Sequence, residues 1–189
     1  MASDTLQGVR VAILVTDGFE EVEMTAPRKA LDEAGAKTSL VSPKADKVRA
    51  WDFTDWSESY AVDVPLGSAS PGDYDALLLP GGVINPDTLR ADAKAVAFAK
   101  AFFDALKPVA SICHGPWTIV ETGEARGRRM TSWPSLKTDL KNAGATWVDE
   151  EVVVDRGLVT SRSPDDMAAF NRQTIALFAT ARPRAEPAA

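Results

Sequence analysis

The chain contains one cysteine and one histidine, and the two residues are adjacent. They are Cys113 and His114, in the stretch VASICHGPW (109–117). A thiol beside an imidazole suits nucleophilic catalysis, because the imidazole can accept the thiol proton and leave a reactive thiolate. The alternative is that Cys113 is a small buried apolar residue, which is a common role of a free cysteine. The residues around the pair bear on this choice.

Acidic residues and glycines at two other places could complete a site with the thiol. VTDGFEEVE ends a predicted strand and carries Glu20, Glu21 and Glu23. If this segment is helical, Glu20 and Glu23 share a face and Glu21 points elsewhere. LLLPGG ends another predicted strand in Gly81 and Gly82, whose backbone N–H groups could stabilise an oxyanion. Convergence of these groups on one thiol favours the catalytic interpretation.

The elements that must position these residues alternate as in a parallel α/β sheet. Continuous apolar runs predict strands that are buried on both faces, at VAILVT (11–16), TSLVS (38–42), ALLLP (76–80) and VASIC (109–113). Longer amphipathic runs predict crossover helices, at APRKALDEAGA (26–36), with a proline near the helix start, and DAKAVAFAKAFFDALK (92–107). Since open α/β sheets bind ligands at the carboxyl ends of their strands, we expect the site at that edge.

The remaining sequence predicts smaller additions to this sheet. Segment 48–72 is aromatic, acidic and rich in turn residues, which favours a small β excursion. Segment 150–164 contains two β-rich runs separated by DRG, a hairpin signal. A last helix is expected from about Pro164 to Ala181, followed by a frayed tail, RPRAEPAA.

Cys113 is predicted to occupy a tight turn between a strand and the helix that begins in HGPWTIVETG. Ser111 and Gly115 are small residues on either side of it, as a strained elbow that exposes a nucleophile requires. The helix N-terminus supplies backbone N–H groups and the positive end of a dipole, both of which stabilise a thiolate. We therefore predict that the pKa of Cys113 lies well below that of a free thiol. Because an ionised carboxylate would oppose the thiolate, we also predict that Glu23 is protonated and donates a hydrogen bond to the sulfur.

Composition limits the class of protein. The 189 residues, 45% hydrophobic and 25% charged, fit a single domain (1–189) with its core at about 9–181. A net charge of −6 argues against nucleic acid or an anionic membrane as a partner. A single cysteine cannot form an internal disulfide, which favours a reducing cytoplasm, and MASDTLQG lacks the pattern of a targeting segment. One Cys and one His cannot supply a zinc site, so we expect no metal and no cofactor.

Together the motifs resemble the PfpI branch of the DJ-1/PfpI superfamily, which contains intracellular cysteine peptidase homologues, general stress proteins and proposed deglycases. The resemblance covers essentially the whole chain and rests on DGFEEVE, ALLLPGG, ASICHGP, GRRMTSWPSLKTDLKNAGATWVDEEVVVD and LVTSRSPDD. It implies a flavodoxin-like three-layer α/β sandwich with a mostly parallel central sheet, related to class I glutamine amidotransferases. It also implies a homodimer or a higher homo-oligomer. Amidotransferase activity is excluded, because it needs a late histidine and none follows His114.

The resemblance also assigns roles to residues. Cys113 matches the nucleophile of the elbow, and His114 matches the histidine that follows it. Glu23 matches the acidic residue whose carboxyl group contacts the sulfur. Gly82, with the backbone amide of His114, matches the oxyanion hole.

In this family a neighbouring subunit supplies the acid that orients the histidine, and Asp87 occupies that position in place of a glutamate. Because His114 follows Cys113 directly, we expect the two side chains to leave the elbow in different directions, so that the imidazole depends on the acid from the neighbour. Trp133 stands where the archaeal peptidases have a tyrosine near the nucleophile. Glu20 and Trp133 are expected around the central residues without being catalytic themselves.

Two functions are compatible with such a thiol. The first is a stress-response cysteine hydrolase that acts on glyoxal-type protein adducts, as a deglycase, or on peptide or acyl substrates. Its substrates would be small aldehyde adducts, peptides or damaged proteins. The second is a redox sensor or chaperone-like protein in which Cys113 is oxidised to a sulfinate without turnover. The sequence leaves the choice open, and we favour the hydrolase.

Overall fold

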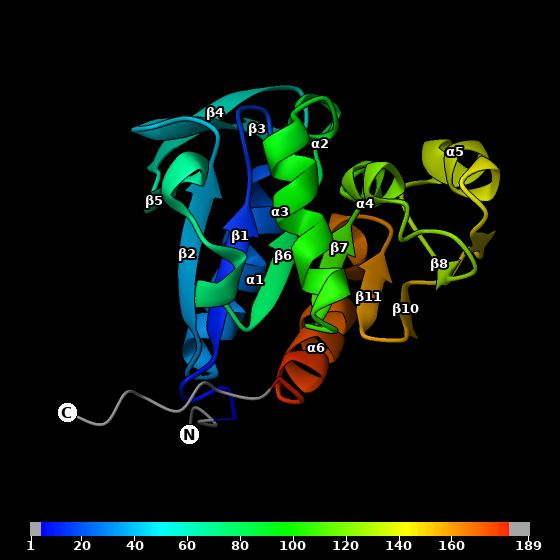
Figure 1. Cartoon of the computed structure of the whole chain (residues 1–189). Coiled ribbons are helices and arrows are strands. Elements are labelled where there is room, and N and C mark those ends of the chain that lie inside the picture. Colours follow the sequence, from blue (N-terminus) through cyan, green and yellow to red (C-terminus); the bar gives the residue numbers. More distant parts are fainter. Residues whose placement is uncertain (1–4, 182–189) are drawn as a thin grey trace.

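The computed structural model describes residues 5–181, and Figure 1 shows their central sheet with helices on both faces. Within this range the sheet has seven strands, all parallel except for β10 at one edge, which runs antiparallel to its neighbour. Their order is β10 (Val152–Asp155), β11 (Leu158–Ser161), β7 (Val109–Ile112), β6 (Ala76–Leu79), β1 (Arg10–Leu14), β2 (Lys37–Ser42) and β5 (Val64–Pro65). The predicted fold class, a mostly parallel α/β sandwich, is confirmed, and so is the hairpin, which is β10–β11.

Two groups of helices cover the two faces of the sheet. One face carries α1 (Glu21–Glu33) and α6 (Met167–Phe178), and the other carries α2 (Ile84–Arg90), α3 (Ala93–Asp104), α4 (Pro116–Thr122) and α5 (Lys137–Asn142). Alternate residues of β1 enter the two cores: Leu14 packs on the α3 side and Ile13 on the α1 side. Strands buried on both faces explain why their sequences are continuously apolar.

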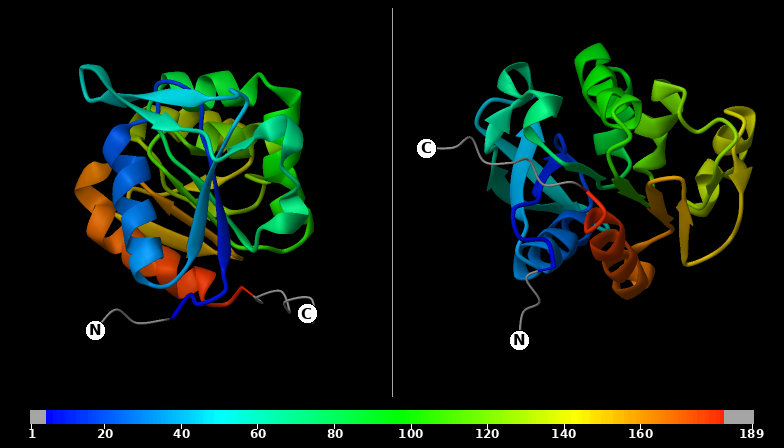
Figure 2. Two further views of the ribbon diagram at one scale, coloured as in Figure 1. Left: turned by 90° about the vertical axis from the view of Figure 1, so that its left-hand side faces the viewer. Right: turned by 60° about the horizontal axis from the view of Figure 1, so that its bottom comes forward.

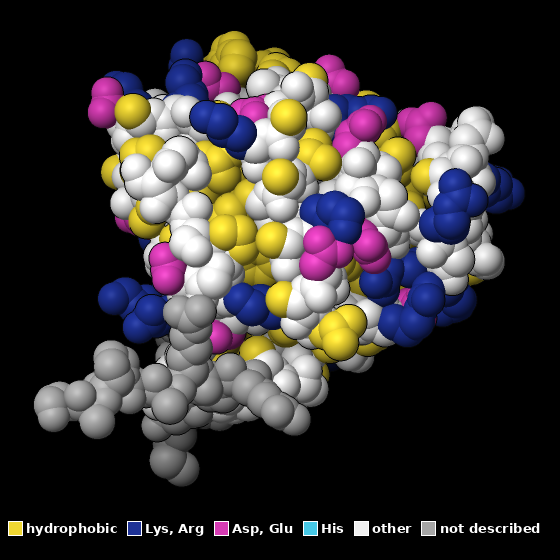
Figure 3. All heavy atoms as spheres, viewed as in Figure 1, with side chains coloured by type: hydrophobic (Ala, Val, Ile, Leu, Met, Phe, Trp, Pro, Cys, Tyr) yellow, Lys and Arg dark blue, Asp and Glu magenta, His cyan; other side chains and the backbone are white. Residues whose placement is uncertain are grey.

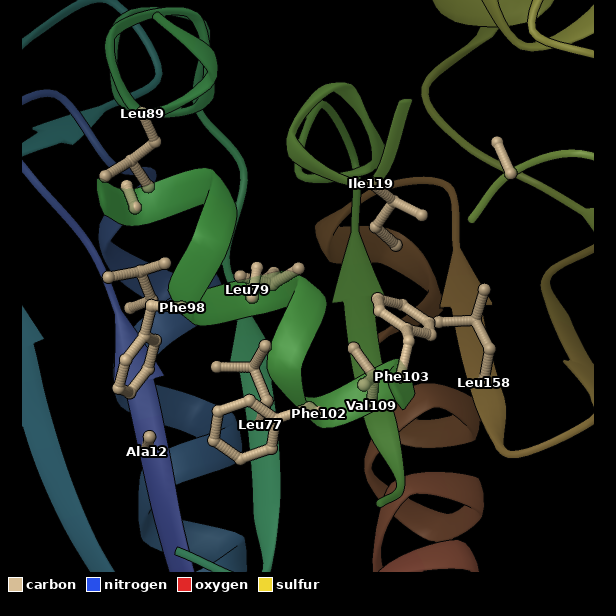
Figure 4. Packing of buried hydrophobic residues seen from close by; sticks show 14 of the residues in the cluster. Ala12, Leu77, Leu79, Leu89, Phe98, Phe102, Phe103, Val109, Ile119 and Leu158 are labelled. Carbon is tan, nitrogen blue, oxygen red and sulfur yellow. The ribbon is translucent and has the colours of Figure 1, made fainter. Parts of the chain in front are cut away.

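Helix α3 shows how the core is filled (Figure 4). Phe98 and Phe102, one turn apart, meet edge to face with ring centroids 5.4 Å apart. They lie over strand residues such as Leu77. Helix α3 starts at Ala93, within the predicted range. The side chain of Asp92 caps this end, because it accepts a 2.8 Å hydrogen bond from the amide of Lys94.

Helix α1 begins at Glu21, and the prediction that it begins near Ala26 was wrong. Pro27 lies inside the helix. The early start is stabilised by burial of Met24, Pro27 and Leu31, whose spacing places them on one helix face. Acidic residues in the first turn also suit the positive end of the helix dipole.

The other predicted elements differ from the observed ones at their ends. Strand β7 ends at Ile112 and excludes Cys113, which has a φ of 60° that a strand cannot accommodate. The last helix starts with a 3₁₀ turn, Pro164–Asp166, and continues as α6 to Phe178. The tail predicted to be frayed, 182–189, lies outside the described residues.

The predicted β excursion is an antiparallel ribbon of β3 (Lys47–Asp52) and β4 (Asp55–Ala61), followed by β5 and the 3₁₀ turns Leu66–Ser68 and Pro71–Asp73. Figure 2 shows the ribbon across the end of the sheet where the β1 and β2 strands finish. The amide of Trp51 donates a 2.8 Å hydrogen bond to the carbonyl of Phe19, and the amide of Gly18 donates one to Arg49. These bonds attach the ribbon to the loop that follows β1.

The sequence did not predict a small addition beside α4. It consists of the short pair β8 (Arg129–Met130) and β9 (Thr146–Trp147), the 3₁₀ turn Pro134–Leu136, and α5. On the face drawn in Figure 3, basic and acidic side chains are interspersed. Among residues 5–181, no helix combines the length and the apolar character that crossing a membrane requires.

Candidate active site

The site lies where the strand order reverses. β1 has β2 on one side and β6, followed by β7, on the other, and the loops after β1, β6 and β7 meet at this edge. They enclose a pocket of about 290 Å³. Six of the predicted site residues line it: Glu20, Glu23, Gly82, Cys113, His114 and Trp133. Asp87 does not line it.

Cys113 occupies a strained elbow, as its neighbours in the sequence predict. Its φ of 60° is in the left-handed region that L-residues rarely adopt. Its amide is fixed by a 3.0 Å hydrogen bond to the carbonyl of Ser161, and 6% of the residue is exposed. Gly115 permits the turn, because a Cβ there would lie 2.5 Å from the carbonyl oxygen of Leu79. The strain and close packing direct the thiol into the pocket.

Glu23 is fully buried at the floor of the pocket. Its Oε2 accepts a 2.8 Å hydrogen bond from the amide of Gly81. Its Oε1 has no hydrogen-bond partner among the described residues. Burial raises the pKa of Glu23 to about 8, although interactions with Cys113 and the Gly81 amide lower it. The carboxyl group therefore holds a proton at pH 7, in line with the prediction, and can donate it toward the sulfur.

The predicted low pKa of Cys113 was wrong. Burial raises the pKa of the thiol, and Glu23, when ionised, acts in the same direction. The backbone amides of His114 and Gly82 favour the thiolate but do not outweigh burial. Helix α4 is only seven residues long, so its dipole is a small contribution.

His114 lies against the thiol, and the expectation that the two side chains diverge was wrong. Its Nδ1 is 3.1 Å from the Sγ of Cys113, whose backbone is in the left-handed region. Its Nε2 is 3.4 Å from the Oγ of Ser135. Burial lowers the pKa of His114 to about 4, so the ring is neutral at pH 7. If Nδ1 accepts from the thiol, Nε2 carries the hydrogen and faces Ser135.

Aromatic rings fix the plane of this imidazole. Trp133 stacks on His114 with centroids 5.8 Å apart and planes at 25°, and Trp117 meets it edge-on at 5.2 Å. The amide of Trp133 donates to the carbonyl of Cys113, which places the stacking residue beside the elbow. Trp117 and Ser135 were not identified from the sequence, since neither forms a motif with His114.

Gly82 and Asn85 shape the loop opposite the thiol. Gly82 has a φ of 73°, and a Cβ there would lie 2.3 Å from the carbonyl oxygen of Gly18. Asn85 is fully buried: its Oδ1 accepts from the amide of Thr16 at 2.7 Å, and its Nδ2 donates to the carbonyls of Pro80 and Gly81. Asn85 thus ties the loop after β6 to the end of β1. Sequence reasoning missed this residue.

Replacing Asn85 by alanine will lower the free energy of unfolding by about 2–3 kcal/mol, because three buried backbone groups lose their partner. Urea unfolding measures the change. Asn142→Ala, at the exposed end of α5, is the matched control and should change stability by less than about 0.5 kcal/mol. Equal effects of the two substitutions would contradict a tethering role for Asn85.

The remaining predicted residues occupy different places. Glu20 precedes α1, and its Oε1 accepts a 3.1 Å hydrogen bond from the amide of Phe53. Glu21 points away from the pocket, to Ser57 and Tyr60 of the ribbon, as predicted from the helical spacing. Asp87 is exposed in the first turn of α2, and its contact with another subunit stays a prediction. Within residues 5–181, no three His, Cys, Asp or Glu side chains are arranged to hold a metal ion.

Comparisons with known proteins found related sequences and a similar solved structure. A sequence model described as the DJ-1/PfpI family matches residues 9–177. A Bacillus subtilis (strain 168) protein named "Putative cysteine protease YraA" is 44% identical over 169 residues, 89% of this chain and 98% of that protein. General stress protein 18 of the same organism is 42% identical over 172 residues, 90% and 98% of the two chains. The crystal structure of Drosophila melanogaster DJ-1beta is similar with a TM-score of 0.82 and 25% identity, over 90% of each chain.

Proposed function

The chain belongs to the DJ-1/PfpI family, and from that premise and the geometry of the pocket we propose that it is a stress-response cysteine hydrolase. The observation that carries the proposal is the 3.1 Å contact between the Sγ of Cys113 and the Nδ1 of a neutral His114, inside a pocket. A base in its neutral form beside a nucleophile can accept the nucleophile's proton.

The first step is attack by sulfur on a carbonyl carbon. His114 Nδ1 takes the proton of the thiol as the C–S bond forms, and the carbonyl electron pair moves onto oxygen. The amides of Gly82 and His114, which already interact with the sulfur, are the donors for this oxyanion. Because the buried Glu23 is protonated at pH 7, it adds no second negative charge beside the oxyanion of the intermediate.

The second step is collapse of the tetrahedral intermediate. With an acyl substrate, the oxyanion re-forms the carbonyl, the C–N or C–S bond of the attacked carbon breaks, and the leaving group takes the proton held by His114. With a glyoxal adduct, the leaving amine or thiol is bonded to the neighbouring carbon. It departs with a proton as the attacked carbon loses its C–H proton, and the resulting enediol takes a proton on the neighbouring carbon to give a 2-hydroxyacyl thioester of Cys113. Water then attacks the acyl–sulfur carbon with His114 as the base, which releases the acid and restores the thiol. The low pKa of His114 favours proton donation in the collapse, because the buried imidazolium is unstable.

The pocket volume supports a small substrate group. A cavity of about 290 Å³ accommodates one side chain or a small adduct, and it is at the lower end of ligand-site volumes. We therefore propose glyoxal-derived adducts on protein side chains as substrates, with peptide bonds as the alternative acyl substrate. The reducing cytoplasm expected from the single cysteine stays a prediction.

Steady-state release of amine or thiol from glyoxal adducts, compared with peptide cleavage, tests the proposal. Turnover should exceed the rate at which free glyoxal is scavenged, and Cys113→Ser should remove it. Asn142→Ala serves as an exposed control substitution. A rate that is the same in Cys113→Ser, or that equals scavenging alone, would end the hydrolase proposal.

We further propose a homodimer in which Asp87 of a neighbouring chain orients His114. Support comes from the exposed position of Asp87 and from the resemblance. If so, Cys113→Ser and Asp87→Asn chains, each inactive alone, will recover activity when mixed, because one hybrid site has both residues. If the contact of His114 with Ser135 suffices instead, Asp87→Asn alone will keep full activity. Subunit exchange must be demonstrated by mass spectrometry of the mixture.

A redox role is the second candidate function. It is supported by the groups around Cys113. The backbone amides of His114 and Gly82 and the protonated carboxyl group of Glu23 could donate hydrogen bonds to the oxygens of a sulfinate. Peroxide treatment followed by intact mass should then show addition of two oxygen atoms at Cys113 and no further oxidation. Addition of three oxygens at low peroxide would count against a protected sulfinate.

A further inference from the structure

We propose that the pocket above Cys113 selects a cationic side chain, a guanidinium or an ammonium group, through Glu20 and the aromatic rings around it. This inference rests on the proposed hydrolase function, because it names the class of substrate for the same site. It is derived from the charges, unpaired polar atoms and rings of the described pocket residues.

The charge of the lining favours a cation. No lysine or arginine belongs to the described lining, and its histidine is neutral because burial lowers the pKa of His114 to about 4. The two acidic residues differ in exposure: Glu23 is fully buried and neutral at pH 7, whereas Glu20 is 8% exposed. A carboxylate entering the pocket would therefore meet no positive partner and would face Glu20.

One carboxylate oxygen of Glu20, Oε2, is free to accept a hydrogen bond from a ligand. Its Oε1 accepts a 3.1 Å hydrogen bond from the amide of Phe53, but its Oε2 has no hydrogen-bond partner among the described residues, although the side chain is more than nine-tenths buried. Burial raises the pKa of Glu20, which reflects an environment that disfavours an unpaired carboxylate. A cationic donor in the pocket would remove that penalty and form a charge-assisted hydrogen bond.

Aromatic rings provide the second half of the cation site. Trp51 and Phe53 belong to the ribbon, Trp133 belongs to the loop after β8, and all three line the pocket. Trp51 is held in place by a bridge to Glu20 and by edge-on packing against Trp56 at 5.4 Å. Aromatic faces attract guanidinium and ammonium groups, and indole does so most strongly. A carboxylate and aromatic rings in one pocket distinguish a cation from a neutral group of the same shape.

A binding experiment with the full-length Cys113→Ser chain tests this inference without chemistry. Tryptophan fluorescence would follow titration with N-acetyl-arginine methylamide, with the citrulline analogue, whose urea group is a neutral isostere, and with the glutamate analogue. We expect the arginine probe to bind at least about tenfold more tightly than the citrulline probe, and the glutamate probe to bind most weakly.

Glu20→Gln keeps an acceptor for Phe53 and should lower the affinity for the arginine probe at least about tenfold, while citrulline binding changes little. Glu58→Gln, on an exposed part of the same ribbon, is the control of equal charge change and should leave the preference intact. Trp51→Leu is a second variant and should also reduce the preference for arginine, should Glu20→Gln fold poorly.

Equal binding of the arginine and citrulline probes, absence of arginine binding, or a preference that survives in both Glu20→Gln and Trp51→Leu would overturn the inference. Failure of the hydrolase proposal has a different signature. In that case wild-type protein would keep the preference for the arginine probe but would not turn over any adduct.

Discussion

Replacing Glu23 by glutamine will stabilise the protein progressively between pH 4.5 and pH 8, by roughly 4 kcal/mol at the upper end. The folded protein holds the Glu23 proton up to a pKa of about 8, because the carboxyl group is fully buried, whereas the unfolded chain loses it near 4.5. The folded state therefore binds more protons across this range, and the wild-type stability from this group falls as pH rises. Glutamine resembles the protonated acid and cannot ionise.

Urea unfolding of both proteins at pH 5 and pH 8 measures this difference. His114 has the opposite sign, because its folded pKa of about 4 lies below the ordinary 6.5, so its contribution is lost as pH falls from 6.5 to 4. It is present in both proteins and cancels in the comparison. Glu58→Gln removes an exposed carboxylate and should show no comparable trend. A stability difference between wild type and Glu23→Gln that is flat with pH would contradict a buried, neutral Glu23.

The strands of the central sheet could be predicted because burial on both faces leaves a continuous apolar run, and four of these runs coincide with β1, β2, β6 and β7 to within two residues. Convergence of their carboxyl ends also followed from the topology of parallel sheets. The start of α1 could not be predicted in the same way. A proline is typical of the first turn of a helix, but Pro27 lies inside α1, because packing against the sheet decides where this helix begins.

The site was predicted as far as rare residues and glycines reveal it. Cys113, Glu23 and Gly82 do meet in one pocket. The hydrogen bonds of Asn85, by contrast, connect backbone groups distant in sequence, and an asparagine before a proline carries no sign of this. Such partners are chosen by the folded backbone, and a single sequence does not encode them as a local pattern.

The pKa of Cys113 was mispredicted because local features and burial act in opposite directions. The elbow and the amides that stabilise a thiolate belong to the motif itself and are visible in the sequence. Desolvation depends on residues distant in sequence that enclose the same pocket, including Trp51 and Phe53 of the ribbon and Trp133. At pH 7 the thiol of Cys113, the imidazole of His114 and the carboxyl group of Glu23 are therefore neutral, and charge develops on these three groups only as substrate reacts.

Replacing Glu23 by leucine will slow alkylation of Cys113 by iodoacetamide at pH 7 by about 10- to 100-fold, whereas glutamine will change it by less than about threefold. The thiolate is the reacting form. We expect Glu23, which is protonated at pH 7, to stabilise the thiolate by donating a hydrogen bond to the sulfur. Glutamine retains a donor at that position and leucine does not.

The pH dependence separates this role from simple packing. Above pH 8, Glu23 ionises and its charge opposes the thiolate, so Glu23→Gln should react faster than wild type there, although the two are similar at pH 7. Rates would be measured by intact mass from pH 6 to 10, with unfolding curves to show that each variant is folded at each pH. Equal slowing by leucine and glutamine at every pH would mean that the carboxyl group only fills space beside the sulfur. Slower reaction of Glu23→Leu at pH 7, with Glu23→Gln separating from wild type and reacting faster above pH 8, would show that the proton on Glu23 controls the reactivity of Cys113.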